Sequence, residues 1–300
     1  MQPESAIQPA LDIRDLRIEA RTAQGMLPIV RAATLRIDPG EVVGIVGESG
    51  SGKTTLIRSV VGLLDRNVRV ADGTIGVHGQ EVMSVDRNRT AAIRGKQVGF
   101  VFQDSTRSLN PLLKVRTQMK EVLDRHRPEL SKAETQAVME EVLQRMLIND
   151  VPRVLGAYPH ELSGGMCQRI AIAIALVADP ALLLADECTT ALDVTTQAEV
   201  VALLRELVSG SSVGLAFVTH DLALAADLCD RIAVMRQGEI VELRPTAELL
   251  ADPHAQYTRD LLAAVPAWAE LAPSEDATTI APVPDLPDAP DAEPDQEPAA

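Results

Sequence analysis

Short apolar runs alternate with helical patterns along most of this chain. Residues 41–46 form one such run and lead through several glycines into a helical segment at 52–64. Residues 213–218 form another run, and a helical pattern at 221–229 follows it. Strands without a polar face are buried on both sides, so the pattern predicts an α/β protein with a parallel sheet covered on both faces.

The same patterns predict the remaining elements. Ser131 and Glu134 have the spacing of a capping box and mark the start of a helix. Gln237-Gly238 predicts a hairpin turn. Further strands are expected at 11–20, 34–37, 74–78, 97–102, 181–185, 232–236 and 239–243. Further helices are expected at 112–146 with a break at Arg127-Pro128, and at 163–178, 194–208, 246–250 and 254–264.

Composition divides the chain into three parts. Residues 1–10 are an N-terminal extension, residues 11–265 carry the periodic patterns, and residues 266–300 are rich in Pro, Asp, Glu and Ala. Within the middle part, residues from about 104 to 178 are mostly helical and predict a helical subdomain beside the sheet. The last part cannot bury enough apolar area to offset its ordering entropy, so a disordered acidic tail is expected.

Charge and cysteine content narrow the possible functions. The net charge is −15, and nine acidic residues with no Lys or Arg lie from residue 270 onward. An acidic body argues against nucleic acid as a partner, because a basic face is expected there. The three cysteines have no paired spacing, so neither a disulfide framework nor a zinc site is predicted. Asp179-Pro180 interrupts the most apolar stretch, so we expect a soluble chain that reaches a membrane only through a partner.

The strongest chemical motif is a glycine-rich loop between a predicted strand and a predicted helix. It matches the pattern G-x-x-x-x-G-K-[ST], in which backbone N–H groups and the helix N-terminus bind phosphates. Lys53 is expected to reach the β- and γ-phosphates of ATP, and Thr54 to bind Mg²⁺. The predicted nucleotide-binding residues of the loop are Gly47, Glu48, Ser49, Gly50, Ser51, Gly52, Lys53, Thr54 and Thr55.

Two carboxylates follow the apolar strand at 181–185. Asp186 is expected to hold Mg²⁺ through water, and Glu187 to polarise the water that attacks the γ-phosphate. Taken alone, such a sequence more often belongs to a strand that simply ends at the charged surface. The glycine-rich loop upstream favours the metal-binding interpretation, which resembles a Walker B segment.

A serine and two glycines open the predicted helix at 163–178. Ser163, Gly164 and Gly165 leave bare backbone N–H groups that can bind an anion, although a simple helix cap has the same appearance. The stretch 162–169 resembles the LSGGQ-type signature of ATP-binding-cassette (ABC) ATPases. This resemblance implies a P-loop NTPase nucleotide-binding domain with a RecA-like core, a helical subdomain and an antiparallel β region.

The resemblance to ABC ATPases extends to smaller motifs. Gln103 is similar to the glutamine that contacts Mg²⁺ and faces the membrane subunit, and residues 191–193, with Asp193, are similar to the D-loop. His220 is similar to the switch histidine that contacts the γ-phosphate. The implied catalytic residues are thus Glu187, His220, Lys53 and Gln103. The family also implies two ATP molecules bound between two ATPase subunits arranged head to tail.

Four further stretches resemble the oligopeptide, dipeptide and nickel importer group of this family. They are 108–111, 158–166, 189–195 and 257–266. They imply an ATPase on the cytoplasmic face of the cell membrane that powers import of peptides or nickel-like solutes. The implied partners are membrane permeases, a sister ATPase that forms a heterodimer, and, indirectly, an extracytoplasmic solute-binding protein. An exporter subunit, an ABC ATPase that moves no solute, and an ATP-gated module without hydrolysis remain alternatives.

Three departures from the family pattern bear on the site. Cys188 follows Glu187 where the family usually has proline, and no loss of catalysis is expected from this change. No aromatic residue lies between Leu16 and Val30, and Ala20 lies near the place where a ring would stack on adenine. No cysteine follows Cys229, so the iron–sulfur cluster of some relatives is not expected.

Overall fold

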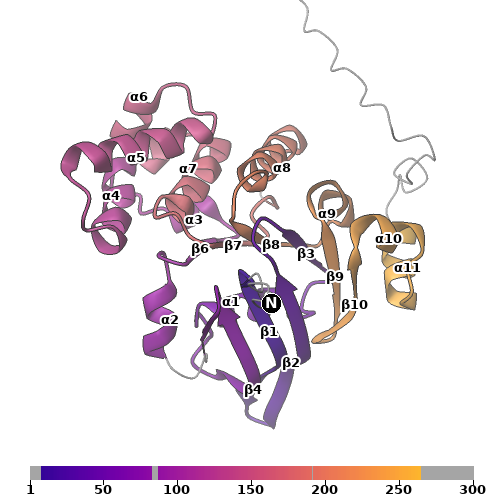
Figure 1. Cartoon of the computed structure of the whole chain (residues 1–300). Helices are drawn as coiled ribbons and strands as arrows, with labels where there is room; N and C mark the ends of the chain where they lie inside the picture. Colours follow the sequence, from indigo (N-terminus) through magenta and orange to yellow (C-terminus); the bar gives the residue numbers. More distant parts are fainter. Residues whose placement is uncertain (1–7, 83–86, 191, 265–300) are drawn as a thin grey trace, which may run out of the picture.

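The computed structural model describes residues 8–82, 87–190 and 192–264. Expectations for residues 1–7, for Ala191 in the D-loop segment and for the acidic tail lie outside this part of the chain. Figure 1 shows one sheet in the middle of the molecule, a second sheet below it, and a group of helices at its upper left.

A six-stranded sheet forms the middle layer (Figure 1). Its strands are β3 (Val42–Val46), β6 (Val98–Val101), β7 (Leu182–Asp186), β8 (Gly214–Thr219), β9 (Arg231–Arg236) and β10 (Glu239–Pro245). The order is β10-β9-β3-β8-β7-β6, and all neighbours pair in parallel except β10 and β9. Gln237 and Gly238 both have positive φ and form the hairpin turn between these two strands, as predicted.

Helices cover one face of this sheet. Leu215 and Phe217 of β8 pack into the same buried cluster as residues of these helices. The alternate residues Ala216 and Val218 point into a separate cluster on the opposite face. The covering helices are α7 (Gly164–Leu176), α8 (Val194–Val208) and α9 (Leu222–Leu228). Both faces are therefore buried, as the apolar strands predict.

A helix and a second, antiparallel sheet cover the opposite face. The helix is α1 (Lys53–Val60), whose Leu56, Ile57 and Val60 lie in the second cluster. The second sheet has the order β2-β1-β4-β5. Its strands are β1 (Leu11–Thr22), β2 (Gly25–Ile37), β4 (Val68–Val77) and β5 (Gln80–Glu81). An antiparallel β region beside a parallel core is the architecture that the sequence resemblance implies.

A group of helices lies beside the β6 and β7 edge of the parallel sheet (Figure 1). Ser131 and Glu134 exchange hydrogen bonds with each other's backbone and so form the predicted capping box. The helices of this group are α3 (Ser105–Ser108), α4 (Val115–His126), α5 (Lys132–Arg145), α6 (Val151–Gly156), the 3-10 helix η1 (Pro159–Glu161) and α7. Two further helices end the described chain, α10 (Thr246–Ala251) and α11 (Gln256–Ala263).

Several element boundaries differ from the predictions. Helix α1 ends at Val60 rather than at residue 64, because Gly62 adopts a left-handed conformation with φ 63°. Strands β2 and β4 begin well before the predicted starts at 34 and 74, at Gly25 and Val68. The added residues are mostly exposed or half-buried, so they lack the alternation that marks a strand. The short helices α2 (Arg87–Ile93), α3 and α6 were not predicted.

Among the described residues, no helix is both long enough and apolar enough to span a bilayer.

Candidate nucleotide site

The glycine-rich loop connects the end of β3 to the start of α1. Gly47 has φ 152°, and a β-carbon there would lie 2.1 Å from the backbone oxygen of Met235. Gly52 has φ 103° at the N-cap of α1, where a side chain would be strained. Only glycine suits these two positions, which explains the loop sequence in terms of backbone geometry.

Lys53 is the first residue of α1 and is almost fully buried, with 4% of its surface exposed. Its ammonium group donates hydrogen bonds to the backbone oxygens of Gly47, at 2.7 Å, and Glu48, at 2.8 Å. Burial lowers the pKa of Lys53, while the nearby carboxylates of Glu187 and Asp186 act in the opposite direction. The loop thus folds around a cation that is available to bind phosphate.

The loop borders a cavity of about 330 Å³. Gln103, after β6, and Glu187, after β7, line the same cavity, so the fold brings together residues from distant parts of the sequence. Ile29 of β2 lines it as well. The predicted loop residues that line it are Ser49, Gly50, Gly52, Lys53, Thr54 and Thr55. Gly47, Glu48 and Ser51 are not among the lining residues.

Asp186 lies at the buried end of β7, with 1% of its surface exposed. It accepts a hydrogen bond of 2.8 Å from the Thr54 hydroxyl and pairs with Arg58 at 3.2 Å. Burial raises the pKa of Asp186 despite these two partners. The Thr54 hydroxyl donates its proton to Asp186, so its lone pairs remain free, and hard oxygen donors of this kind suit Mg²⁺. The residues present are thus compatible with the expected cation.

Glu187 follows Asp186 in a left-handed backbone conformation with φ 46°. Its carboxylate accepts a hydrogen bond of 2.9 Å from the Gln103 side-chain amide. The Nδ1 atom of His220 lies 3.8 Å from the other carboxylate oxygen, beyond hydrogen-bonding distance. Two side chains from neighbouring loops therefore flank a carboxylate at the cavity wall, where it could orient water.

The signature residues lie in a different place. Ser163 caps α7 by accepting a hydrogen bond from the Met166 backbone N–H at 3.3 Å. Asp193 caps α8, and the hydrogen bonds from Thr196 lower its pKa. Ser163, Gly164, Gly165 and Asp193 line a separate cavity of about 460 Å³. The predicted nucleotide-binding residues therefore line two separate cavities, each with part of the predicted set, and we refer to these cavities as half-sites.

Three residues at the loop were not predicted from the sequence. Arg58 lies one helical turn after Thr54, so helix periodicity could have placed it beside Asp186. Ile29 carries no such signal, because it occupies an irregularity in the pairing of β2 with β1. The hydroxyl of Tyr257 accepts a hydrogen bond from the Glu48 N–H, and because 209 positions of sequence separate the two residues, no local pattern marks the contact.

A glycine-rich loop with a buried lysine and a threonine, one carboxylate at the same cavity and a second bonded to the threonine together define the class of P-loop ATPases. Residues 30–190 match the profile of the ABC transporter family. The chain belongs to the ABC transporter family and is an ABC ATPase, as the signature motif indicates. The antiparallel sheet and the helical group beside the core agree with this assignment.

Similar proteins include ATP-binding proteins named for peptide import or oligopeptide transport. The chain is 43% identical over 265 residues to a peptide import ATP-binding protein of Brucella ovis, a match that spans 86% of this chain and 78% of that protein. It is 39% identical over 271 residues to the oligopeptide transport ATP-binding protein OppD of Bacillus subtilis, spanning 90% of this chain and 75% of that protein.

Solved structures of the family share the fold. A dimeric ATP-binding cassette in a post-hydrolysis state bound to ADP and phosphate superposes with a TM-score of 0.69 at 28% identity, covering 79% of this chain and 98% of that one. The cbiO1 protein of Clostridium perfringens, part of an ABC transporter complex, superposes with a TM-score of 0.70 at 25% identity, covering 88% of this chain and 98% of that one. The predicted fold class is therefore confirmed.

Proposed function

We propose that this chain hydrolyses ATP at the cytoplasmic face of the cell membrane and thereby powers peptide uptake by an ABC importer. The observation that carries the proposal is the shared cavity in which Lys53, Gln103 and Glu187 meet. The resemblance to peptide import ATP-binding proteins over most of the chain supports the choice of solute and direction.

The chain's own residues divide the work of hydrolysis. The loop N–H groups and Lys53 bind and position the phosphates, and Glu187 orients the attacking water. His220 holds the γ-phosphate, and Gln103 keeps the Glu187 carboxylate at the cavity wall until nucleotide binds. Thr54 and Asp186, with Gln103 nearby, would hold Mg²⁺. When bound, Mg²⁺ supplies positive charge against the phosphate oxygens.

The two half-sites support a dimer. Ser163, Gly164, Gly165 and Asp193 lie in a cavity that does not include the phosphate-binding loop, so they are free to complete the site of a second subunit. A helix N-terminus with bare N–H groups suits a phosphate presented from another chain. We propose that this second subunit is a sister ATPase, so that the working unit is a heterodimer.

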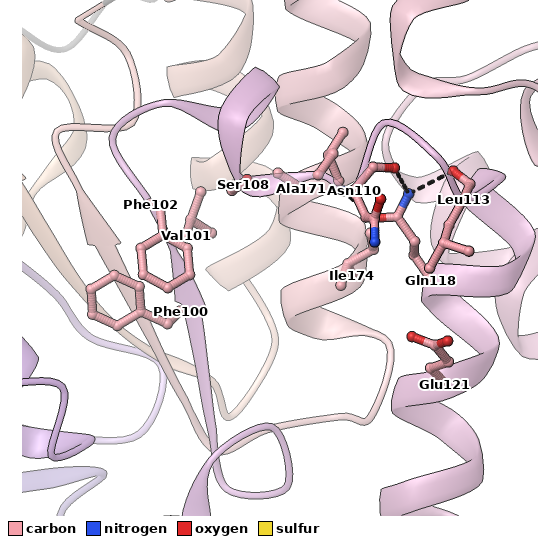
Figure 2. Close-up of a pocket in the computed structure, with 11 residues that line it drawn as sticks. Phe100, Val101, Phe102, Ser108, Asn110, Leu113, Gln118, Glu121, Ala171 and Ile174 are labelled. Carbon is pink, nitrogen blue, oxygen red and sulfur yellow. Dashed lines mark hydrogen bonds between the residues drawn. The ribbon is translucent and has the colours of Figure 1, made fainter.

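A groove beside Gln103 is the proposed contact with the permease. It has a volume of about 270 Å³ and lies between the end of β6 and helices α4 and α7 (Figure 2). Phe100 and Phe102 line it with ring centres 4.7 Å apart, and Phe102 is 39% exposed. Figure 2 shows Gln118 at the other end, bonded to the backbone oxygens of Asn110 and Leu113 at 3.1 and 2.9 Å.

The groove has a direct connection to the catalytic carboxylate. Phe102 precedes Gln103, whose amide bonds to Glu187. A permease segment pressed against Phe102 would therefore move the group that holds Glu187. This short connection supports coupling between transport and hydrolysis through the loop after β6.

Reconstitution tests the proposed function. The chain, its sister ATPase, the permeases and the solute-binding protein are placed in vesicles, and uptake of labelled peptides is measured. We expect uptake that requires ATP and is lost in the Glu187→Gln variant. Nickel uptake without peptide uptake would show that the proposed solute class is wrong. ATP-driven release of solute without the binding protein would show that the transporter is an exporter.

A further inference from the structure

Helix α11, the last helix of the described residues, is fixed to the parallel sheet by a buried carboxylate. The pairing of β10 with β9 is irregular between Ile240 and Glu242, as at a β-bulge, which redirects side chains. Glu242 is buried and accepts hydrogen bonds from the backbone N–H groups of His254, at 2.8 Å, and Ala255, at 3.0 Å. Ala255 is the N-cap of α11 and has no side-chain cap of its own. Glu242 therefore holds the backbone immediately before the first residue of α11 and helps to fix the position of this helix.

The first turn of α11 carries Tyr257 to the phosphate-binding loop. Tyr257 is buried, with 6% of its surface exposed, and the guanidinium carbon of Arg236 lies 4.7 Å from its ring centre. Its hydroxyl accepts a hydrogen bond of 3.0 Å from the backbone N–H of Glu48. The backbone oxygen of Glu48 accepts the 2.8 Å hydrogen bond from Lys53. Residue 48 is thus held from both sides, by Tyr257 and by Lys53.

These two contacts lead to different expectations once nucleotide binds. The ammonium group of Lys53 has three donors, and its bonds to the oxygens of Gly47 and Glu48 compete with the phosphates that it is expected to reach. Neither Glu48 nor Tyr257 lines the cavity, so the bond between them does not compete with the phosphates. It is therefore expected to persist and to hold the start of the loop in place when nucleotide binds.

We propose that Tyr257 is a positioning residue that holds the phosphate-binding loop in its nucleotide-ready shape through the backbone of Glu48. The inference rests on nucleotide binding at Lys53, and it assigns part of the nucleotide affinity to helix α11. A hydrogen bond that preorganises a loop contributes to binding by lowering the ordering cost.

The test compares two variants that each lose one buried hydroxyl. Tyr257→Phe keeps the ring under Arg236 and removes only the bond to Glu48. Thr246→Val removes a buried hydrogen bond to the Cys229 backbone oxygen, in the same C-terminal region but away from the loop. The full-length variants are titrated with Mg·ADP carrying a fluorescent label, and KM for ATP and kcat are measured in the assembled transporter.

We expect Tyr257→Phe to weaken Mg·ADP binding and raise KM roughly threefold to tenfold, with kcat nearly unchanged. Thr246→Val is expected to lower the melting temperature without changing Mg·ADP affinity or KM. Equal affinities of Tyr257→Phe and the parent, or equal losses in both variants, would overturn the proposal.

Two further variants keep the outcome decisive. If Tyr257→Phe does not fold, Glu242→Gln weakens the contact that holds the start of α11 and is expected to raise KM in the same direction, whereas an unchanged KM would refute the inference. Lys53→Ala separates this inference from the site itself. If Lys53→Ala loses nucleotide binding but Tyr257→Phe does not, only the role of Tyr257 is wrong.

Discussion

At the scale of residues, the nucleotide site depends on how two adjacent carboxylates are held. Asp186 is buried and paired with Thr54 and Arg58, whereas Glu187 faces the cavity and is held by Gln103. These two consecutive residues thus meet different surroundings, because β7 ends at Asp186 and Glu187 lies beyond it. The first suits a cation and the second suits a water molecule.

Replacing Glu187 by glutamine separates binding from hydrolysis. The amide keeps the size and the contact to Gln103 but cannot accept a proton, so ATP turnover is expected to fall by about 10²–10⁴-fold. Mg·ATP binding, followed by equilibrium titration, is expected to remain within about threefold of the parent. A parent and variant that turn over ATP equally slowly would instead support an ATP-gated module without hydrolysis.

Asp186→Asn is expected to abolish the Mg²⁺ dependence of nucleotide binding while stabilising the nucleotide-free protein near neutral pH. Because burial raises the pKa of Asp186, the folded state binds a proton more tightly than the unfolded state. That contribution to stability is present at low pH and is lost as the pH rises through the raised pKa. The gain in melting temperature from Asp186→Asn should therefore shrink as the pH falls, and a gain that grows on acidification would contradict this explanation.

At the scale of elements, two serine caps have similar backbone conformations and different expected roles. Ser131 starts α5 with a capping box, and Ser163 starts α7 with one hydrogen bond to Met166. The first lies in the helical group away from either half-site, and the second lines the signature cavity. Their substitution separates a stabilising cap from one that also faces a ligand.

Ser131→Ala is expected to cost about 1 kcal/mol and to lower the melting temperature by roughly 2–4 °C, with ATP turnover unchanged. Ser163→Ala is expected to lower stability by a similar amount and also to reduce turnover in the assembled dimer. Thermal melts and turnover assays on both variants test this difference. Equal turnover in both would mean that Ser163 is only a helix cap.

The elements that the sequence predicts well are those with strong local rules. Helix α8 has the bounds expected from its pattern, 194–208, and the capping box fixes the start of α5. Strand β2 begins earlier than predicted, because its exposed first residues pair with β1. No local pattern in the sequence identifies that partner. The contact between Tyr257 and Glu48 was missed for the same reason, since the hydrogen bond joins distant segments.

At the scale of the whole molecule, the motifs gather into two surfaces rather than one site. The phosphate-binding loop meets Gln103 and Glu187 in one cavity, while the signature residues and Asp193 line another. Motif order predicts both sets of residues, the family resemblance implies that they serve different sites, and the fold places them in separate cavities. This separation supports the proposal that a second subunit completes each site.

Deleting residues 273–300 is expected to leave ATP turnover within about twofold of the full chain. This segment has no apolar pattern, is acidic and contains no Lys or Arg. It is therefore not expected to contribute to a packed core. Turnover of the truncated chain in the assembled transporter provides the measurement. A large loss would assign the tail a role in the ATPase itself.

The most direct test of the central claim is ATP turnover by the Lys53→Ala variant, assembled with its sister ATPase and permeases. Lys53 is the buried cation around which the phosphate-binding loop folds. Its loss is expected to reduce Mg·ATP hydrolysis by roughly two orders of magnitude at this chain's site. A Lys53→Ala complex that hydrolyses ATP as fast as the parent would contradict the account.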